Sequence, residues 1–295
     1  MDAPGEVEGL HWQVKRVEGR RAAYGVAGSG RPLLFLHGWG LGHRSYRRAL
    51  TRMVGAGVRV WAPAMPGFGG TADLPPEDVS LAGYAQWVAD FVRAVDVPTP
   101  LVLVGHSFGG GVAIQTAHDH PDLVDRLVVV NSIGGSAWTD GRGVLRSIAD
   151  RPLWDWGLHL QADLLPARQV SRVLPVVVED ALTNVLRNPR SRWRVGRLAA
   201  RTNLVAELEE LKQRGTPVVV LWGTGDRVVP AACLESIRSA LGDVDVVTVP
   251  GSHSWLLADP DGFAEVMTNV IAAVPVRAAD GRLGRRDGGA GRRAG

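Results

Sequence analysis

Short apolar runs alternate with amphipathic stretches along most of the chain. The helical type is clearest at Leu81, Tyr84, Val88, Phe91 and Val95, which are spaced three or four positions apart. The predicted strands are an antiparallel pair at 12–17 and 21–26, followed by 33–36, 58–62, 101–104, 126–131, 217–222 and 244–249. The predicted helices cover 45–54, 80–95, the stretch after 107, 232–241 and 260–274. This alternation is typical of an α/β fold, with a mostly parallel sheet and helices on both faces.

The pattern changes between residues 134 and 214, where no clear buried strand is found. This stretch is rich in arginine and contains the helix breakers Pro152, Pro166, Pro175 and Pro189, so we interpret it as a helical insertion. The predicted organisation is a core in two parts, a helical cap and a disordered Gly/Arg-rich tail, at 1–133 and 215–275, 134–214 and 276–295 respectively. Two roles stay open for the tryptophans of the insertion, lining an aromatic substrate pocket or packing the cap against the core. They are Trp138, Trp154, Trp156 and Trp193.

The charge distribution argues against a nucleic-acid partner. The net charge is +3, but residues 277–295 contain six arginines and only two aspartates. The rest of the chain is therefore slightly acidic and offers no basic excess to a nucleic acid. The tail has no apolar periodicity, so we interpret it as a solvated, disordered terminus. RNA binding by this tail is the alternative.

Three further features concern location. No apolar run approaches the length of about 18 residues that a membrane span requires, so none is expected. The first residues have neither the basic nor the apolar part of a signal peptide. Cys233 is the single cysteine, which excludes a disulfide within the chain. We therefore expect a cytoplasmic protein, and the sequence does not specify its oligomeric state.

One short motif points to chemistry. Gly105-His106-Ser107-Phe108-Gly109 follows an apolar run and precedes a helical stretch. A strand that turns into a helix at Gly-x-Ser-x-Gly is a nucleophile elbow, whose strained serine needs small neighbours. The chain has 37 glycines among 295 residues, so the motif alone is a weak signal. The prediction depends on what accompanies it.

Four motifs occur in a fixed order, each at the carboxyl end of a predicted strand. They are His37-Gly38-Trp39-Gly40, the elbow at 105–109, Gly223-Thr224-Gly225-Asp226, and Gly251-Ser252-His253. Over residues 10–275 this arrangement resembles the α/β-hydrolase superfamily, in particular its cap-bearing esterase, lipase and dehalogenase-like branch. The resemblance implies an eight-stranded, mostly parallel sheet with an inserted helical cap. Ligands of open α/β sheets bind at these strand ends.

The resemblance implies a catalytic triad of Ser107, Asp226 and His253, in the chain order of this fold. A serine hydroxyl needs an adjacent base, and His253 would supply it. Asp226 would hold the histidine's tautomer and stabilise its charged form. Some members of the superfamily carry the acid one strand earlier, but residues 130–132 contain no carboxylate here. Turn formation or helix capping is the alternative role for Asp226.

The resemblance also implies an oxyanion hole. The residue after the nucleophile, Phe108, would donate one backbone N–H, helped by the N-terminus of the following helix. The second N–H would come from the main chain of Trp39, in a loop that Gly38 and Gly40 let approach the substrate. A simple glycine-rich turn is the alternative for that loop.

Other motifs give no sign of a metal or a cofactor. His118 and His120 lie at a predicted helix end without further ligands at metal spacing, so no metal site is expected. The glycine-rich stretch at 67–70 does not open a helix of a nucleotide-binding βαβ unit. We expect an enzyme that needs no cofactor.

The expected function is therefore hydrolysis of a carboxylic ester of a hydrophobic or aromatic small molecule. Ser107 would form an acyl-enzyme, and water activated by His253 would release the acid. A serine at this position argues against dehalogenase and epoxide hydrolase activity, since those relatives use aspartate. Hydrolysis of C–C bonds and cofactor-free haloperoxidase chemistry use the same triad and stay open. A ligand-binding protein of this fold with slow turnover is an alternative of a different class.

Overall fold

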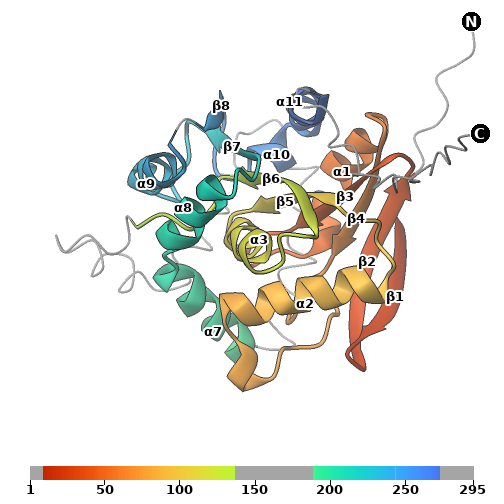
Figure 1. Ribbon diagram of the computed structural model, residues 1–295. Helices are drawn as coiled ribbons and strands as arrows, with labels where there is room; N and C mark the ends of the chain where they lie inside the picture. Colours follow the sequence, from red (N-terminus) through yellow and green to blue (C-terminus); the bar gives the residue numbers. More distant parts are fainter. Residues whose placement is uncertain (1–8, 137–188, 243, 273–295) are drawn as a thin grey trace, which may run out of the picture.

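The computed structural model describes residues 9–136, 189–242 and 244–272 (Figure 1). Their eight strands form one sheet in the order β1-β2-β4-β3-β5-β6-β7-β8. The strands are β1 His11–Val17, β2 Arg20–Gly28, β3 Arg31–Leu36, β4 Val58–Pro63, β5 Leu101–His106, β6 Val124–Val130, β7 Val218–Gly223 and β8 Asp245–Val249. The pairs β1–β2 and β2–β4 are antiparallel, and all others are parallel. The predicted α/β fold with its eight-stranded, mostly parallel sheet is confirmed.

Helices cover both faces of this sheet. The α-helices are α1 Arg47–Val54, α2 Leu81–Ala94, α3 Phe108–Asp119, α7 Pro189–Arg201, α8 Val205–Gln213, α9 Ala231–Leu241, α10 Trp255–Ala258 and α11 Pro260–Ala272, with short 3-10 turns η1 His43–Tyr46 and η2 Pro76–Asp78. Buried residues of α2, α3, α8 and α9 belong to one core cluster, and those of α1, α10 and α11 to another. In Figure 1, α3 lies across the middle strands.

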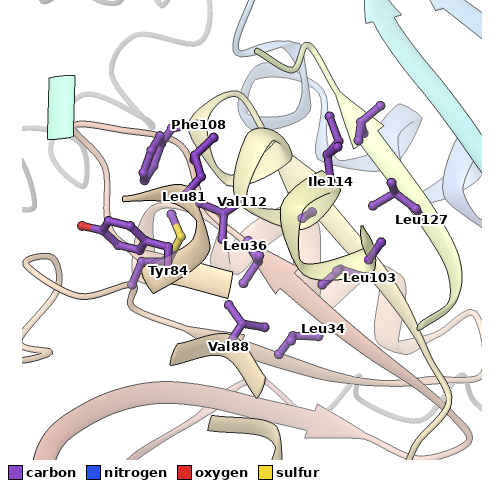
Figure 2. Packing of buried hydrophobic residues seen from close by; sticks show 14 of the residues in the cluster. Leu34, Leu36, Leu81, Tyr84, Val88, Leu103, Phe108, Val112, Ile114 and Leu127 are labelled. Atoms are coloured by element: carbon purple, nitrogen blue, oxygen red, sulfur yellow. The ribbon is translucent and has the colours of Figure 1, made fainter. Parts of the chain in front are cut away.

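The strand side chains alternate between these two cores. In β5, Leu101 and Leu103 join the cluster of α2 and α3, whereas Val102 and Val104 join the cluster of α1 and α11. Successive side chains of a strand point to opposite faces, so both faces must be apolar when both are covered. Figure 2 shows the first cluster, where Leu103 lies close to α3. This explains why the middle strands are continuous apolar runs in the sequence.

The predicted strands and helices are confirmed within two residues at their ends. Two differences concern the neighbourhood of the site. The helix predicted at 45–54 begins as the turn η1 and becomes α-helical only at Arg47. The short helix α10 was not predicted, and it follows His253 directly after Ser254.

The predicted cap at 134–214 lies for the most part outside the described residues. Its last part is helical, as α7 and α8. Val195 and Ala199 of α7, together with Leu208 and Leu211 of α8, are buried in the core cluster of α3 and α9. The end of the predicted insertion is thus packed on the core, and the domain boundaries stay a prediction.

The topology brings the predicted site residues to one edge. The chain runs from β3 to β4 on one side of β3 and then crosses to β5 on the other side. Such a reversal leaves a crevice at the carboxyl ends of the strands, where α/β proteins bind ligands. The segments that follow β3, β5, β6, β7 and β8 all leave from this edge, because these strands are parallel.

Candidate active site

Ser107 stands at a sharp turn between β5 and α3. Its φ of 56° and ψ of −118° are strained for a residue with a side chain. A Cβ on Gly105 would lie 2.6 Å from the Cα of Gly110, and one on Gly109 would lie 2.6 Å from the carbonyl oxygen of His37. Close backbone packing therefore excludes side chains on both sides of Ser107, as the elbow motif predicts.

Asp226 and His253 meet across the ends of β7 and β8. The Nδ1 of His253 lies 2.8 Å from the Oδ2 of Asp226, and their side chains are 2% and 0% exposed. A carboxylate only accepts hydrogen bonds, so Nδ1 carries the proton and donates it. In the neutral ring the lone pair then lies on Nε2, the nitrogen that faces away from Asp226. A base with this tautomer can accept a proton from a hydroxyl.

The two oxygens of Asp226 have different partners. Oδ1 accepts the backbone N–H of Val228 at 2.8 Å and of Val229 at 3.0 Å, which is turn chemistry. Oδ2 accepts from His253 and from the Nδ2 of Asn131 at 2.6 Å. The turn role and the acid role proposed for Asp226 are therefore compatible in one side chain.

These contacts keep Asp226 ionised although it is buried. Burial acts to raise the pKa of Asp226, but the charge of His253 and its hydrogen bond act in the other direction. The amide of Asn131 and the N–H of Val229 add to them, and the net result is a pKa below the ordinary value. An ionised Asp226 can orient the ring and balance the positive charge that the ring gains when it takes up a proton.

Asn131 is a site residue that sequence reasoning missed. Besides its bond to Asp226, its Oδ1 accepts the N–H of Gly223 at 3.1 Å and the indole Nε1–H of Trp255 at 2.9 Å. Its φ of 43° lies in the left-handed region, which asparagine tolerates better than most residues. The only signal in the sequence is its place at the end of a strand beside the predicted site. Residues 130–132 are the segment where some members of the superfamily carry the catalytic acid, and here the segment contains the amide of Asn131 instead.

A small apolar cavity joins the remaining predicted residues. Its volume is about 30 Å³, and Ser107 and His253 are the polar side chains that line it. The other lining residues are apolar and come from five different segments, namely Trp39, Phe108, Ile133, Ala199 and Val228. The structure thus brings Ser107, His253, Trp39 and Phe108 together, and Asp226 joins them through His253. Phe108 is also the first residue of α3, where backbone N–H groups favour negative charge.

The loop after β3 is held by His37. Its Nε2 accepts the backbone N–H of Met65 at 2.9 Å, and its Nδ1 donates to the carbonyl oxygen of Gly38 at 2.9 Å. Burial lowers the pKa of His37 to about 4, against the bond to Gly38 that acts to raise it. The ring is therefore neutral at physiological pH and fixes the loop that carries Trp39.

A larger, open groove lies elsewhere on the molecule. It has a volume of about 670 Å³ and lies between the start of β1, helix α1 and the turn from α10 to α11. None of the predicted site residues lines it, so size does not identify the site here.

Within the described residues, no group of three metal-ligating side chains is close enough to bind an ion. No helix in the same part of the chain could cross a membrane.

Comparisons with known proteins agree with the fold. The family model described as "Alpha/beta hydrolase family" matches residues 33–266. An uncharacterized protein of Mycobacterium tuberculosis is 30% identical over 276 residues, with 86% of this chain and 79% of the relative covered. A pimeloyl-[acyl-carrier protein] methyl ester esterase of Aromatoleum aromaticum is 29% identical over 262 residues, covering 81% of this chain and 97% of the esterase.

Among solved structures, a bromoperoxidase from Bacillus anthracis superposes with a TM-score of 0.75 at 16% sequence identity. The superposition covers 88% of this chain and 99% of the bromoperoxidase. The two proteins therefore share the fold over nearly the full length of the bromoperoxidase. The residues that the family model matches include all four motifs. The chain therefore belongs to the alpha/beta hydrolase family.

Proposed function

We propose that the protein is a serine hydrolase that cleaves a carboxylic ester of a hydrophobic or aromatic small molecule. The observation that carries the proposal is the buried Asp226–His253 pair beside a cavity that Ser107 also lines. A serine hydroxyl becomes a useful nucleophile only with such an oriented base. The esterase relative from Aromatoleum aromaticum supports an ester as the substrate.

In the proposed first step, the Oγ of Ser107 attacks the ester carbonyl carbon while Nε2 of His253 takes the hydroxyl proton. The carbonyl electron pair moves onto its oxygen, which the backbone N–H groups of Trp39 and Phe108 stabilise. Loss of one such donor costs roughly 2.7 to 4 kcal/mol in other enzymes. The carbon–oxygen ester bond then breaks, and the alcohol leaves with the proton from His253.

In the second step, water repeats the attack on the acyl-enzyme. His253 takes a proton from the water, the hydroxide oxygen bonds to the acyl carbon, and Ser107 leaves with the proton returned. The apolar lining by Phe108, Ile133 and Val228 favours an apolar acyl group, since burying a charged one there would be costly. The cytoplasmic location expected from the sequence belongs to the same proposal and is testable by cell fractionation.

The first test compares wild type, Ser107→Ala and Ser80→Ala on p-nitrophenyl esters of increasing chain length. Ser107→Ala is expected to lower kcat by about 10⁴-fold or more. Ser80 caps α2 by accepting the N–H of Gly83 at 3.0 Å, so its variant loses stability but keeps kcat. Equal rates for wild type and Ser107→Ala would refute the nucleophile assignment.

The second test asks whether the Oγ of Ser107 displaces fluoride from a fluorophosphonate, so that the protein gains the mass of the phosphonyl group and loses one proton. Labelling without ester turnover would favour the ligand-binding protein or a different acyl substrate.

Added hydrogen peroxide and bromide test the haloperoxidase alternative, in which peroxide replaces water in the second step. A vinylogous diketone tests the C–C hydrolase alternative. A folded wild type that neither labels nor turns over any of these would refute the proposed function.

A further inference from the structure

We propose that Tyr46 and His106 are positioning residues for the reaction. One chain of hydrogen bonds passes through them, and it is called the relay below. The relay connects the loop after β3, which carries Trp39, to the base His253. The inference rests on the proposed function of Ser107 and His253. It adds two residues to the proposed triad and the proposed oxyanion donors. Neither residue lines the cavity beside Ser107, so both act through others.

The relay has three links. The backbone N–H of Gly38 donates to the hydroxyl of Tyr46 at 3.1 Å. The Tyr46 hydroxyl lies 2.9 Å from Nδ1 of His106, and Nε2 of His106 lies 2.9 Å from the carbonyl oxygen of His253. Both side chains are buried, with exposures of 0% for Tyr46 and 1% for His106. Three segments far apart in the sequence are thus joined inside the core.

The chemistry of the end groups fixes the direction of every link. The carbonyl oxygen of His253 only accepts, so Nε2 of His106 must carry a proton. Burial, followed by the nearby charge of His253, lowers the pKa of His106 to about 3, so the ring is neutral at physiological pH. Its single proton is then on Nε2, and Nδ1 presents a lone pair. The Tyr46 hydroxyl therefore donates to Nδ1 while it accepts from Gly38.

Each end of the relay holds a group of the proposed mechanism. At one end, the fixed N–H of Gly38 sets the path of the loop into Trp39, whose N–H is the proposed oxyanion donor. A Cβ on Gly38 would lie 3.0 Å from Nδ1 of His106 and 3.3 Å from the Cβ of Ser107, so this loop passes directly over the relay and the nucleophile. At the other end, His106 holds the backbone of His253.

His253 is consequently held from two sides. Asp226 fixes its ring through Nδ1, and His106 fixes its main chain through the carbonyl oxygen. His106 also precedes Ser107 in the chain, so the nucleophile and the base share one anchor. Displacements of about 1 Å in such an arrangement can cost 10²-fold in rate. We therefore expect the relay to affect kcat much more than KM.

A purely structural role makes a different prediction. The ring of Tyr46 packs against Phe35, with centroids 4.9 Å apart, and this contact needs no hydroxyl. Tyr46→Phe keeps the ring and removes only the hydroxyl. Tyr24→Phe is the matched control, because the hydroxyl of Tyr24 bonds to Gln13 between β1 and β2, away from the cavity.

The kinetic experiment measures kcat, KM and thermal stability of these two variants on the best p-nitrophenyl ester. Tyr46→Phe is expected to lower kcat by about 10- to 100-fold, with KM within about twofold of wild type. Tyr24→Phe should keep the wild-type kcat even if its melting temperature falls as much. If Tyr46→Phe keeps the wild-type kcat, or if both variants lose kcat in proportion to stability, the proposal is wrong.

A second pair of variants tests the two ends of the His106 ring. The amide nitrogen of glutamine lies near the position of Nε2, whereas that of asparagine lies near Nδ1. His106→Gln keeps a donor for the carbonyl oxygen of His253, so it should retain at least about fivefold more kcat than His106→Asn. The reverse order would overturn the proposed link to His253.

A spectroscopic readout keeps the inference testable without any turnover. In protein labelled with ¹⁵N-histidine and ¹⁵N-tryptophan, we expect His106 as the neutral Nε2–H tautomer at pH 7, with the backbone amide signals of Trp39 and His253 displaced in Tyr46→Phe. An Nδ1–H tautomer, or unchanged amide signals, would refute the relay. An inactive wild type with the expected tautomer and displaced signals would instead refute the proposed function and leave the relay standing.

Discussion

The two sides of the candidate site are held in place by different forces. On the elbow side, comprising the loop after β3 and the turn from β5 into α3, backbone atoms pack so closely that only glycine fits at Gly105 and Gly109. On the acid–base side, comprising Asn131, Asp226 and His253, side chains bond to one another across the ends of β6, β7 and β8. The glycines of the elbow side depend on steric fit, whereas the acid–base side depends on polar contacts between side chains.

The two sides also differ in charge. The buried histidines of the elbow side, His37 and His106, are neutral because burial lowers their pKa to about 4 and about 3. The acid–base side contains an ionised carboxylate, whose pKa is lowered by its partners although burial opposes them. Acid, or a side chain added at an elbow glycine, should therefore act first on stability. Loss of a polar contact on the acid–base side should reduce activity as well as stability.

A drop in pH should produce the largest loss of stability. It should act first on the buried histidines of the elbow side. His43 in η1 is a third buried histidine here, with its pKa lowered to about 3 by burial and then by the charges of His37 and Arg44. Unfolded histidines take up protons near pH 6.5, and the folded ones do so only near pH 3 to 4. Stability is thus complete above pH 6.5 and falls as the pH drops, by up to about 1.4 kcal/mol per pH unit for each histidine.

For the three histidines together, the expected loss is roughly 6 kcal/mol between pH 6.5 and 4.5. Asp226 adds a loss of the same sign in a lower pH window, since a lowered carboxylate pKa gives stability that is lost only below about pH 4. Urea unfolding at half-unit pH steps measures the slope. His43→Leu, which removes one imidazole outside the proposed mechanism, should reduce that slope by about one proton. A flat profile down to pH 4.5 would contradict the buried neutral histidines.

Gly109→Ala should have the next largest effect, again on stability. Its new Cβ would lie 2.6 Å from the carbonyl oxygen of His37, and backbone cannot move aside as a flexible side chain can. We expect a loss of about 4 kcal/mol or more in the free energy of unfolding, because β5 or α3 must shift. Gly55→Ala is the matched control: φ is −64° and the nearest atom is at 3.6 Å, so its stability should change by less than about 1 kcal/mol. Equal losses would show that the elbow is not sterically constrained.

The contrast between the sides explains which parts of the site could be predicted from sequence. The strands could be predicted because a strand covered on both faces must be apolar along its length, as in β5. Their order in the sheet depends instead on pairing between distant segments. The elbow was predicted since its steric demand leaves glycines at fixed positions within five residues. Asp226 and His253 were proposed from chain order and from their place after predicted strands, and their hydrogen bond is a property of the fold.

The missed residues act over long sequence separations. Asn131 bonds to a carboxylate 95 positions away, and His106 bonds to a carbonyl oxygen 147 positions away. Tyr46 is 60 positions from His106 and belongs to no motif. A polar side chain leaves no periodic pattern, and its partner is fixed only when distant strands meet at one edge. Prediction from the residues therefore worked best where the constraint is local, and it missed these three residues because their partners are remote.

Asn131→Ala should have the smallest effect of the three on stability and should change activity as well. The variant removes a donor from ionised Asp226 and an acceptor from Gly223 and Trp255. Hydrogen bonds to charged groups contribute about 1.5 to 3 kcal/mol, so we expect a stability loss of about 2 kcal/mol. A less firmly oriented Asp226 should also lower kcat about tenfold, while KM stays near the wild-type value.

The matched control is Asn203→Ala, because the exposed Asn203 accepts a single backbone N–H, that of Val205 at 3.2 Å. Its stability should change by less than about 1 kcal/mol, with kcat unchanged. Asn131→Asp separates orientation from charge: it can still accept from Trp255 but places a second carboxylate beside Asp226. Like charges disfavour each other's ionised forms, so one of the two carboxylates should keep a proton at pH 6. The kcat of Asn131→Asp should therefore be closer to the wild-type value at pH 8 than at pH 6. If Asn131→Ala keeps the wild-type kcat, the turn contacts of Asp226 with Val228 and Val229 are enough to orient its carboxylate. The acid–base side would then depend on contacts between near neighbours in the sequence, as the elbow does.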